Sequence, residues 1–329
     1  MTRRIISVAV GVAFTTGFLA LALRNVHLGA FWEVLRQAKG LWILAMSAVV
    51  VFDLAIRAWR WQILLSQSAK SGFAALFRLE SIGLAINNVL FMRLGELARA
   101  VLAGRELSIP MGTAVSSVAV ERALDMAALL LLFLAAGLAA PVAPLAVRRG
   151  AIAVLAILLA ALIGLSLSGK RLEPGGSWER RVSRWPKLRD LLMHLAAGAR
   201  VLREPKACLA ACLLSLALWS CDALLYWCGA RALGLGHAMD YPTAVLALSW
   251  AGVGAALPAA PGAFGTLEAM VKSLMVELGV APHSAFAYAF FCHMIGYGIV
   301  TLLGLAFLYR IGLSLGELKA ALGQEAPRS

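Results

Sequence analysis

The sequence predicts an all-α polytopic membrane protein with about six full transmembrane helices and two re-entrant helical hairpins. Three observations predict this class. Apolar residues make up 61% of the 329 residues, and the mean hydropathy is +0.84. Only 14% of the residues are charged, against about a quarter in soluble domains. Several apolar runs also approach or exceed the roughly 20 residues that a helix needs to cross a bilayer.

The predicted spans are the clearest apolar runs, at residues 5–23, 41–56, 111–140, 151–167, 208–229 and 286–309. The first run follows Arg3 and Arg4 and in outline resembles a signal peptide. It lacks a convincing small-residue cleavage site, and further spans follow it. We therefore interpret it as a retained first helix.

The one long hydrophilic interval is 168–206. It contains Pro and Gly breakers, and ten Lys or Arg lie between Lys170 and Lys206. Because cytoplasmic loops carry an excess of Lys and Arg, we interpret it as a basic cytoplasmic connector, with both termini also cytoplasmic. A single membrane domain then has a first half at 1–167, a second half at 207–312 and a tail at 313–329. The net charge of +13 reflects this topology and contact with anionic lipids. No nucleic-acid motif accompanies it, and we expect no nucleic-acid partner.

The two halves share an order of elements. An apolar helix precedes "FMRLGELARAVLAGRELSIPMGTAV" in the first half, and another precedes "APGAFGTLEAMVKSLMVELGVAPHSAF" in the second. Each pattern predicts a break, an amphipathic helix with acids, a Pro and a long span. Re-entrant hairpins at about 73–106 and 242–279 would enter from opposite faces, which is the inverted-repeat plan of many transporters. Two ordinary surface turns are the alternative.

The breaks in these hairpins are candidate binding positions. Re-entrant backbone is tolerated at membrane depth only where it is buried in protein or lines a wet cavity. After the second break, at Gly262 and Gly265, a half-helix would begin with exposed N–H groups that attract anions. Near the first break, the paired amides of Asn87 and Asn88 can satisfy freed backbone groups or hold a lipid head group. Glu268 is the counterpart of Glu96.

The first hairpin also carries a charged arm, with Arg93, Glu96 and Arg99 three residues apart. One interpretation is a local row of salt bridges on a solvated face. The other is that Arg93 and Arg99 meet a lipid phosphate, which arginine binds through two parallel hydrogen bonds.

Further charged residues lie within the predicted spans, namely Glu121, Arg122, Asp125 and Asp222. Charges at such depth face a bundle interior or a water-filled cavity, and they need partners. They either join helices in a purely structural way or line a substrate path or proton relay. Asp222 is as good a candidate for a buried partner of Arg122 as for a coupling site. We interpret Asp53 and Arg57 mainly as a structural pair.

The chain offers no pattern for metal, cofactor or covalent chemistry. Its five cysteines form no CxxC pair, and its five histidines show no HExxH or paired spacing. It also has no P-loop for ATP. We therefore expect no metal, no cofactor, no catalytic residues and a protein that is not an enzyme.

Three segments, "NNVLFMRLGELARA", "ERALDMAALLLL" and "PGAFGTLEAMV", resemble the signatures of the flippase-like membrane family. That family includes the transmembrane region of lysylphosphatidylglycerol synthase, the multiple-peptide-resistance factor. The resemblance spans residues 5–312 and implies a polytopic fold with re-entrant helices that moves or binds polar lipids. The family motifs map onto Asn88, Arg93, Gly95, Glu96 and Arg99, then Glu121, Arg122 and Asp125, then Pro261, Gly262, Gly265 and Glu268. This chain departs at Phe91 and Met92, where the family usually has a Pro, so the first hairpin is expected to bend differently.

The resemblance and the residues together predict a lipid translocase of a bacterial cytoplasmic (inner) membrane. An anionic or polar head group would enter near Arg93 and Arg99, pass Glu121, Arg122 and Asp125, and leave near the second hairpin. A gradient or the lipid's own concentration difference would drive it. No soluble synthase domain follows the last span, so we expect no aminoacyl transfer. Two alternatives stay open. One is a membrane-embedded head-group enzyme with Glu96 or Asp125 as acid–base. The other is a scaffold that recruits a soluble partner in lipid biosynthesis, such as hopanoid or glycolipid synthesis.

Overall fold

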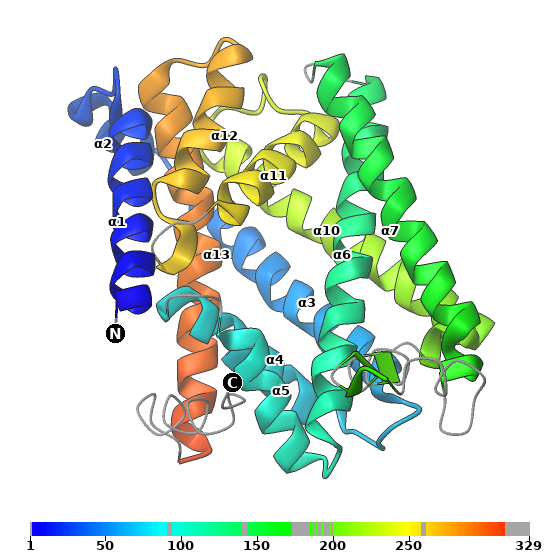
Figure 1. Cartoon of the computed structure of the whole chain (residues 1–329). Coiled ribbons are helices and arrows are strands. Elements are labelled where there is room, and N and C mark those ends of the chain that lie inside the picture. The colour runs from blue at the N-terminus through cyan, green and yellow to red at the C-terminus, as the bar shows by residue number, and fades with distance from the viewer. Residues whose placement is uncertain are drawn as a thin grey trace.

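The computed structural model describes residues 2–90, 94–139, 144–172, 200–257 and 261–312, with isolated positions between 184 and 198. Every element in these ranges is helical, as the sequence predicts, and none is a strand (Figure 1). The α-helices are α1 (Thr2–Leu23), α2 (Leu28–Arg36), α3 (Gly40–Leu65), α4 (Phe73–Val89), α5 (Gly95–Glu106), α6 (Met111–Ala139), α7 (Leu145–Leu172), α10 (Pro205–Ala232), α11 (Tyr241–Ala256), α12 (Thr266–Glu277) and α13 (Pro282–Arg310). Two short 3₁₀ helices are η2 (Arg200–Arg203) and η3 (Pro261–Ala263). Arg93, most of the predicted connector and the tail lie outside the described residues.

Within the described residues five helices are long and apolar enough to cross a membrane, namely α3, α6, α7, α10 and α13. The paired segments Val12–Leu23 and Leu28–Arg36, bent by 83°, make a sixth if they count as one span. The prediction of a multi-pass helical membrane protein is confirmed. Several ends differ from the predicted bounds, most of all at the end of α3, which continues to Leu65 instead of stopping at 56. The extra turns carry Arg57 and Arg60, whose charges ended the apolar run in the sequence but are buried within the protein.

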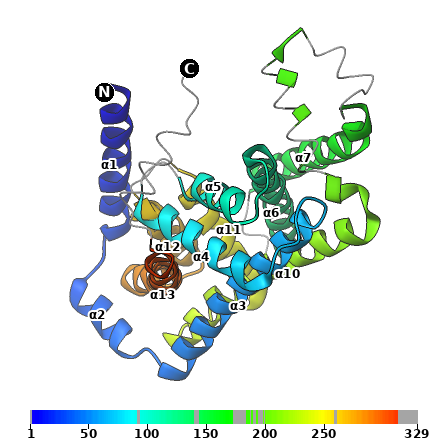
Figure 2. The same cartoon turned by 90° about the horizontal axis from the view of Figure 1, so that it is seen from below.

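The short helix α2 was not predicted. Its Phe31 is buried and packs against Phe286 and Phe290 of α13, with ring centroids 5.4 and 5.8 Å away. Leu28 and Trp32 remain exposed on the same helix. Figure 2 shows α1 at the edge of the bundle, with α2 leading from it toward the other helices. A nine-residue helix of this kind is too short to produce a spanning signal in the sequence.

The first break separates α4 from α5, which have 17 and 12 residues. Both are shorter than the roughly 20 residues of a full span. Leu90 is extended after α4 (φ −101°, ψ 146°), and the side-chain oxygen of Asn87 accepts the N–H of Gly95 at 2.7 Å. A Cβ atom at Gly95 would lie 2.6 Å from that same oxygen. The break therefore depends on an amide that satisfies the free N–H and on a glycine that lets α5 approach α4.

The second break separates α11 from α12, which have 16 and 12 residues. Gly262 and Gly265 both have positive φ, at 75° and 84°, a region that side chains disfavour. Gly254 brings the two helices together, since a Cβ there would lie 2.8 Å from the Cα atom of Leu267. Glycines thus allow both the turn and the close approach.

The segments α3–α6 and α10–α13 match in order and length. Their helices have 26, 17, 12 and 29 residues in the first set and 28, 16, 12 and 29 in the second. After α5 and α12 the chain turns through one residue of positive φ, Ser108 at 54° and Gly279 at 84°. The α4–α5 and α11–α12 hairpins lie toward opposite ends of the bundle, and η3 contacts α4 (Figure 1). These features are those that a duplication predicts. The re-entrant placement and the inverted repeat stay predictions.

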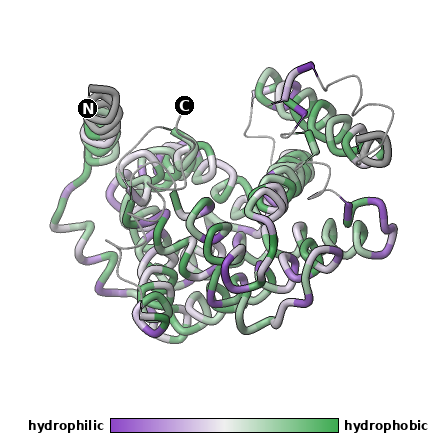
Figure 3. The backbone as a smooth tube through the Cα atoms, turned by 60° about the horizontal axis from the view of Figure 1, so that its bottom comes forward, coloured by the Kyte–Doolittle hydropathy of each residue, from purple (hydrophilic) through white to green (hydrophobic). Residues whose placement is uncertain are grey.

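Packing centres on α3 against α10 and on α4 against α13. The second contact is close, because a Cβ at Gly304 would lie 2.8 Å from the carbonyl carbon of Ser81. By contrast with these closely packed helices, α7 has apolar side chains, including Ile157 and Leu167, that are largely exposed. Exposed apolar residues on a spanning helix face lipid. Figure 3 shows hydrophobic residues along most of the helices, with many of the hydrophilic positions at their connections.

Candidate functional site

The central helix α3 presents Asp53, Arg57 and Arg60 on one face, because residues four and three apart share a helix face. All three are buried. Arg57 donates from Nε to Asp53 Oδ2 at 2.7 Å and from Nη2 to Asp222 Oδ2 of α10 at 3.1 Å. One guanidinium therefore joins carboxylates from the two helices that pack at the centre.

Of the two roles considered for Asp222, the one as a buried partner of Arg122 is wrong, since its partner is Arg57. Ser215 of α10 meets Arg60, and Trp219 donates to Asp125 of α6 at 3.1 Å. Asp222 lies about two turns beyond Ser215 on the same helix, or roughly 10 Å along its axis. At this distance along α10 the carboxylate of Asp222 lies beyond the contact with α6 and beside Arg57.

Arg60 is a fully buried cation that the sequence analysis missed. Its guanidinium binds Asp125, lies 3.1 Å from Glu121 Oε1 and donates to Ser215 Oγ at 2.9 Å. It thereby connects α3 to α6 and α10. Its position one turn after Arg57, on the face that already carries Asp53, is the signal that could have identified it.

Arg99 of α5 connects the first hairpin to α6. It binds Glu80 of α4 and lies 2.9 Å from Glu121 Oε1, and its guanidinium lies 4.8 Å from the ring centre of Trp61. Arg99 and Glu80 are both almost fully buried. A lipid phosphate could reach Arg99 only if these carboxylates were displaced. Glu80 was also missed, although a charge within the apolar run of α4 is a usable signal.

Arg122 is the accessible member of this group. It lies 2.6 Å from Glu121 Oε1, 3.0 Å from Asp125 Oδ2 and 4.0 Å from Glu96 Oε1. Its side chain is 37% exposed, whereas those of Glu121 and Asp125 are buried. Arg122 can therefore meet an incoming group without breaking the contacts behind it.

These residues form two neighbouring ion-pair groups, which together contain four guanidiniums and six carboxylates and are called the ion-pair network below. Arg57 with Asp53 and Asp222 is one group. Arg60, Arg99 and Arg122 with their four carboxylates are the other. The members of the network are Asp53, Arg57, Arg60, Glu80, Glu96, Arg99, Glu121, Arg122, Asp125 and Asp222. When every member is ionised, the network has a formal excess of two negative charges. Buried charges are tolerated when they are paired and hydrogen-bonded, and removing one partner is then strongly destabilising. The network thus holds α3, α4, α5, α6 and α10 in one arrangement.

The second hairpin holds its own carboxylate. Glu268 Oε2 accepts the N–H of Gly265 at 2.7 Å, and its Oε1 lies 2.7 Å from Nδ1 of His293 on α13. An anion was expected at this helix N-terminus, and in the structure the buried Glu268 side chain occupies it. His293 also contacts Phe264, with ring centroids 4.9 Å apart.

A cavity of about 210 Å³ lies between α3, α4, α10 and α13. Its polar lining consists of Asp53, Arg57, Asn88, Asp222, His293 and Tyr297. Asn88 donates to Thr301 Oγ1 of α13 at 2.9 Å, so it links two walls of the cavity, while its neighbour Asn87 caps the break. A much smaller space is lined by Glu80, Asn87, Glu96, Arg99 and Arg122. Leu84 lines both spaces.

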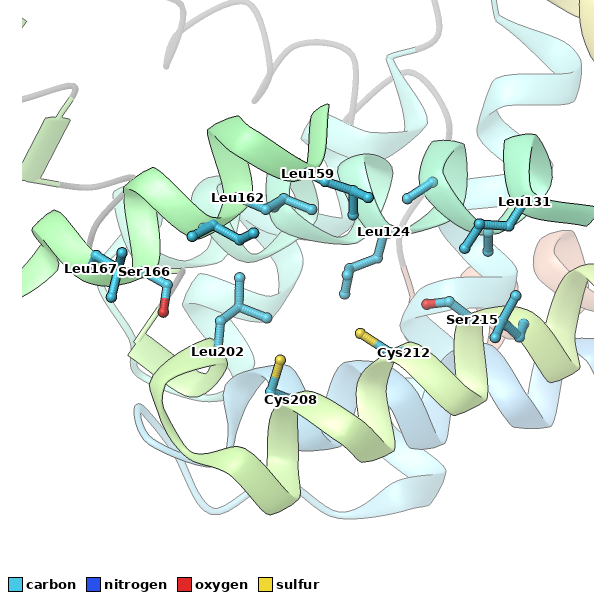
Figure 4. A pocket seen from close by; sticks show the side chains of 14 residues that line it. Leu124, Leu131, Leu159, Leu162, Ser166, Leu167, Leu202, Cys208, Cys212 and Ser215 are labelled. Carbon is cyan, nitrogen blue, oxygen red and sulfur yellow. The ribbon is translucent and has the colours of Figure 1, made fainter. Parts of the chain in front are cut away.

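An apolar cavity of about 270 Å³ lies between α6, α7, α10 and η2 (Figure 4). Leucines of α6 and α7, including Leu124 and Leu162, form one side, and Cys208 and Cys212 of α10 form part of the other. Ser215 lines the same cavity and accepts the hydrogen bond from Arg60. The wall of this apolar space is therefore also an outer wall of the ion-pair network.

The structure brings most of the predicted site residues into two neighbouring groups. Glu96, Arg99, Glu121, Arg122 and Asp125 belong to one part of the network, whereas Asn88 and Asp222 line the larger cavity. Gly262, Gly265 and Glu268 lie at the second break, which reaches that cavity through His293. Asp53 and Arg57, expected to be mainly structural, also line it. Among the described residues no group of three or more His, Cys, Asp or Glu is arranged to hold a metal ion.

Comparison with known families gives one match. The family model described as the lysylphosphatidylglycerol synthase transmembrane (TM) region matches residues 7–304, which include every helix of the network and both hairpins. No curated protein and no solved structure matches the chain.

Proposed function

The chain belongs to the lysylphosphatidylglycerol synthase transmembrane-region family, and from that premise we propose that it is a lipid translocase. It binds the polar or anionic head group of a membrane lipid within the helical bundle and moves it between leaflets. It acts without a catalytic step, in a bacterial inner membrane, with both termini in the cytoplasm. Its partners are membrane lipids and, in a biosynthetic setting, a soluble enzyme that supplies them.

The observation that carries this proposal is the ion-pair network beside the 210 Å³ cavity. Ionisable residues within spanning helices face the bundle interior or a water-filled cavity and mark the paths of substrates and ions. Here Arg122 provides an accessible cation at one side, and Asp222 and His293 face the cavity beyond. A polar head group that enters this region leaves hydrocarbon for a surface that can bind it.

The two spaces suggest the route. A head group first meets Arg122 beside Glu96 in the smaller space, and it then passes Leu84 into the larger cavity. The hairpins lie at opposite ends of the bundle (Figure 1). Movement of one hairpin against the other would open the route to each leaflet in turn, as in inverted-repeat transporters. One acyl chain enters the apolar cavity whose wall includes Ser215, and the rest of the lipid tail stays in the bilayer (Figure 4).

Reconstitution tests the proposal. The purified chain is placed in liposomes that contain fluorescent phosphatidylglycerol or phosphatidylethanolamine. Leaflet exchange is followed by quenching of the outer leaflet, and chemical change is followed by chromatography of the extracted lipids. Exchange of unmodified lipid above protein-free liposomes supports translocation. A modified lipid would point instead to a head-group enzyme, and no exchange with any of these lipids would favour the scaffold.

A pair of arginine substitutions gives the matched control. Arg122→Gln removes the accessible cation of the network, so exchange should fall. Arg78→Gln removes an arginine of α4 that pairs with Glu106 at the surface, away from both spaces, so exchange should continue. Equal rates in the two variants, with both folded, would remove Arg122 from the route.

A further inference from the structure

Two carboxylates of the larger cavity share a single cation. Asp53 and Asp222 both bind Arg57, at 2.7 and 3.1 Å, so the group carries one surplus negative charge when all three are ionised. The three residues come from the two helices that cross at the centre of the bundle, and all three line the cavity. An isolated charge at this depth is costly unless something neutralises it.

The nearby cations of the network do not supply the missing charge. Arg60, the next cation along α3, is engaged by Asp125 and Glu121. The network as a whole contains more carboxylates than guanidiniums, so the surplus is not compensated within it. The cavity walls that face the pair from α4 and α13 contribute uncharged Asn88 and Tyr297.

The remaining titratable group on the cavity wall is His293 of α13. Glu268 of α12 lies behind it and holds its Nδ1 atom at 2.7 Å. The contact at Nδ1 sets which ring nitrogen carries the proton. Cavities that carry protons through membrane proteins combine such histidines with Asp and Glu.

The hydrogen bonds of Asp53 give a second, independent indication that the surplus negative charge of this pair is costly. Asp53 is 6% exposed, and its Oδ1 atom is buried with no hydrogen-bond donor. An ionised carboxylate oxygen without a donor is costly in such a place, and adding a proton to the pair removes the charge that causes the cost. Asp222, whose side chain is 23% exposed, is the member that water in the cavity can reach.

We propose that Asp53 and Asp222 form a proton-binding site that takes up one proton from the cavity. Binding converts one carboxylate to a neutral carboxyl group and leaves Arg57 paired with the other. The coupling of this proton to transport rests on the proposed function, whereas the binding itself does not. In that setting, a proton gradient supplies the driving force for movement of the head group.

Infrared difference spectroscopy tests the binding directly. The whole chain in liposomes is exchanged between neutral and acidic buffers at constant salt, and the C=O stretch of protonated carboxyl groups is recorded. The wild type should show a band typical of a carboxyl group shielded from bulk water. Asp222→Asn or Asp53→Asn should abolish or markedly reduce this band, because the carboxamide imitates the neutral acid and still accepts from Arg57. Glu277→Gln, at an exposed position on α12, is the control and should leave the band unchanged.

Three other outcomes would overturn the proposal. A wild-type band that both Asn variants retain places the proton elsewhere. No pH-dependent band in the wild type means that the pair does not titrate. A spectral change on adding sodium at fixed pH identifies a metal cation as the ligand. Asp222→Glu provides a check if an Asn variant fails to fold, because it keeps a carboxyl group and should only shift the band. The spectra need no lipid movement, so failure of the translocation assay would not affect them.

Discussion

Arg99→Met is the substitution whose effect the ion-pair network predicts most sharply. It keeps the long apolar stem and removes the guanidinium that binds Glu80 and Glu121. Glu121 retains Arg60 and Arg122 as partners. Glu80 is 1% exposed, and Arg99 is its ion-pair partner among the described residues. The variant therefore leaves one buried carboxylate uncompensated, which costs about 3–5 kcal/mol.

The reverse change should cost less. Glu80→Met leaves Arg99 paired with Glu121 at 2.9 Å and stacked over Trp61, so about 1–3 kcal/mol is expected. The double variant Glu80→Met with Arg99→Met should be more stable than Arg99→Met alone, because it removes the uncompensated charge together with its partner. Arg78→Met, at the partly exposed pair with Glu106, is the control and should cost no more than about 1 kcal/mol.

Unfolding of the purified variants by titration with a denaturing detergent, followed by circular dichroism, measures these free energies. The order of destabilisation should be Arg99→Met first, then the double variant and Glu80→Met, then the control. The reasoning would be refuted if Arg99→Met cost no more than Glu80→Met. Strict additivity in the double variant would equally contradict it, since contacting partners in a buried network couple.

Three further substitutions test the hairpins and the route. Gly95→Ala should destabilise the protein by about 1–3 kcal/mol, because its Cβ would collide with α4. Gly150→Ala, where nothing lies within 4 Å, should not, and thermal unfolding in detergent compares them. Leu84→Trp should slow leaflet exchange with folding intact, because the indole would obstruct the passage between the two spaces; unchanged exchange would exclude that route. Glu268→Lys should abolish exchange by losing the His293 pair and the helix cap, whereas exposed Glu277→Lys should not, and equal rates in the liposome assay would count against a role for the second hairpin.

The membrane-spanning helices could be predicted from the sequence because their formation is local. In hydrocarbon every backbone N–H and C=O group must be satisfied within its own segment, so an apolar run of sufficient length determines a helix without reference to the rest of the chain. The breaks are local as well. Gly262 and Gly265 adopt positive φ, which glycine tolerates, and the amide of Asn87 that caps the first break lies eight residues from Gly95. These parts of the prediction needed only neighbouring residues.

The partners of the buried charges could not be predicted in the same way. Helical periodicity places Asp53, Arg57 and Arg60 on one face, but it does not say which helix that face meets. Arg57 pairs with a carboxylate 165 residues away and Arg60 with a hydroxyl 155 residues away. The partner of each buried charge depends on where the close-packed helices cross. On α10, Trp219 meets Asp125, whereas Asp222, one turn later, meets Arg57. The alternative that paired Asp222 with Arg122 was wrong for this reason.

The sequence by itself determined the fold class, the spans, the two breaks and a set of charges that could not face lipid. Only the tertiary structure decided that these charges form two neighbouring ion-pair groups, that Glu268 occupies its own helix N-terminus and that Asp53 and Asp222 share one arginine. The physical reason is the difference in range. Helix formation and membrane insertion depend on the composition of one segment, whereas ion pairing depends on packing between segments far apart in the chain.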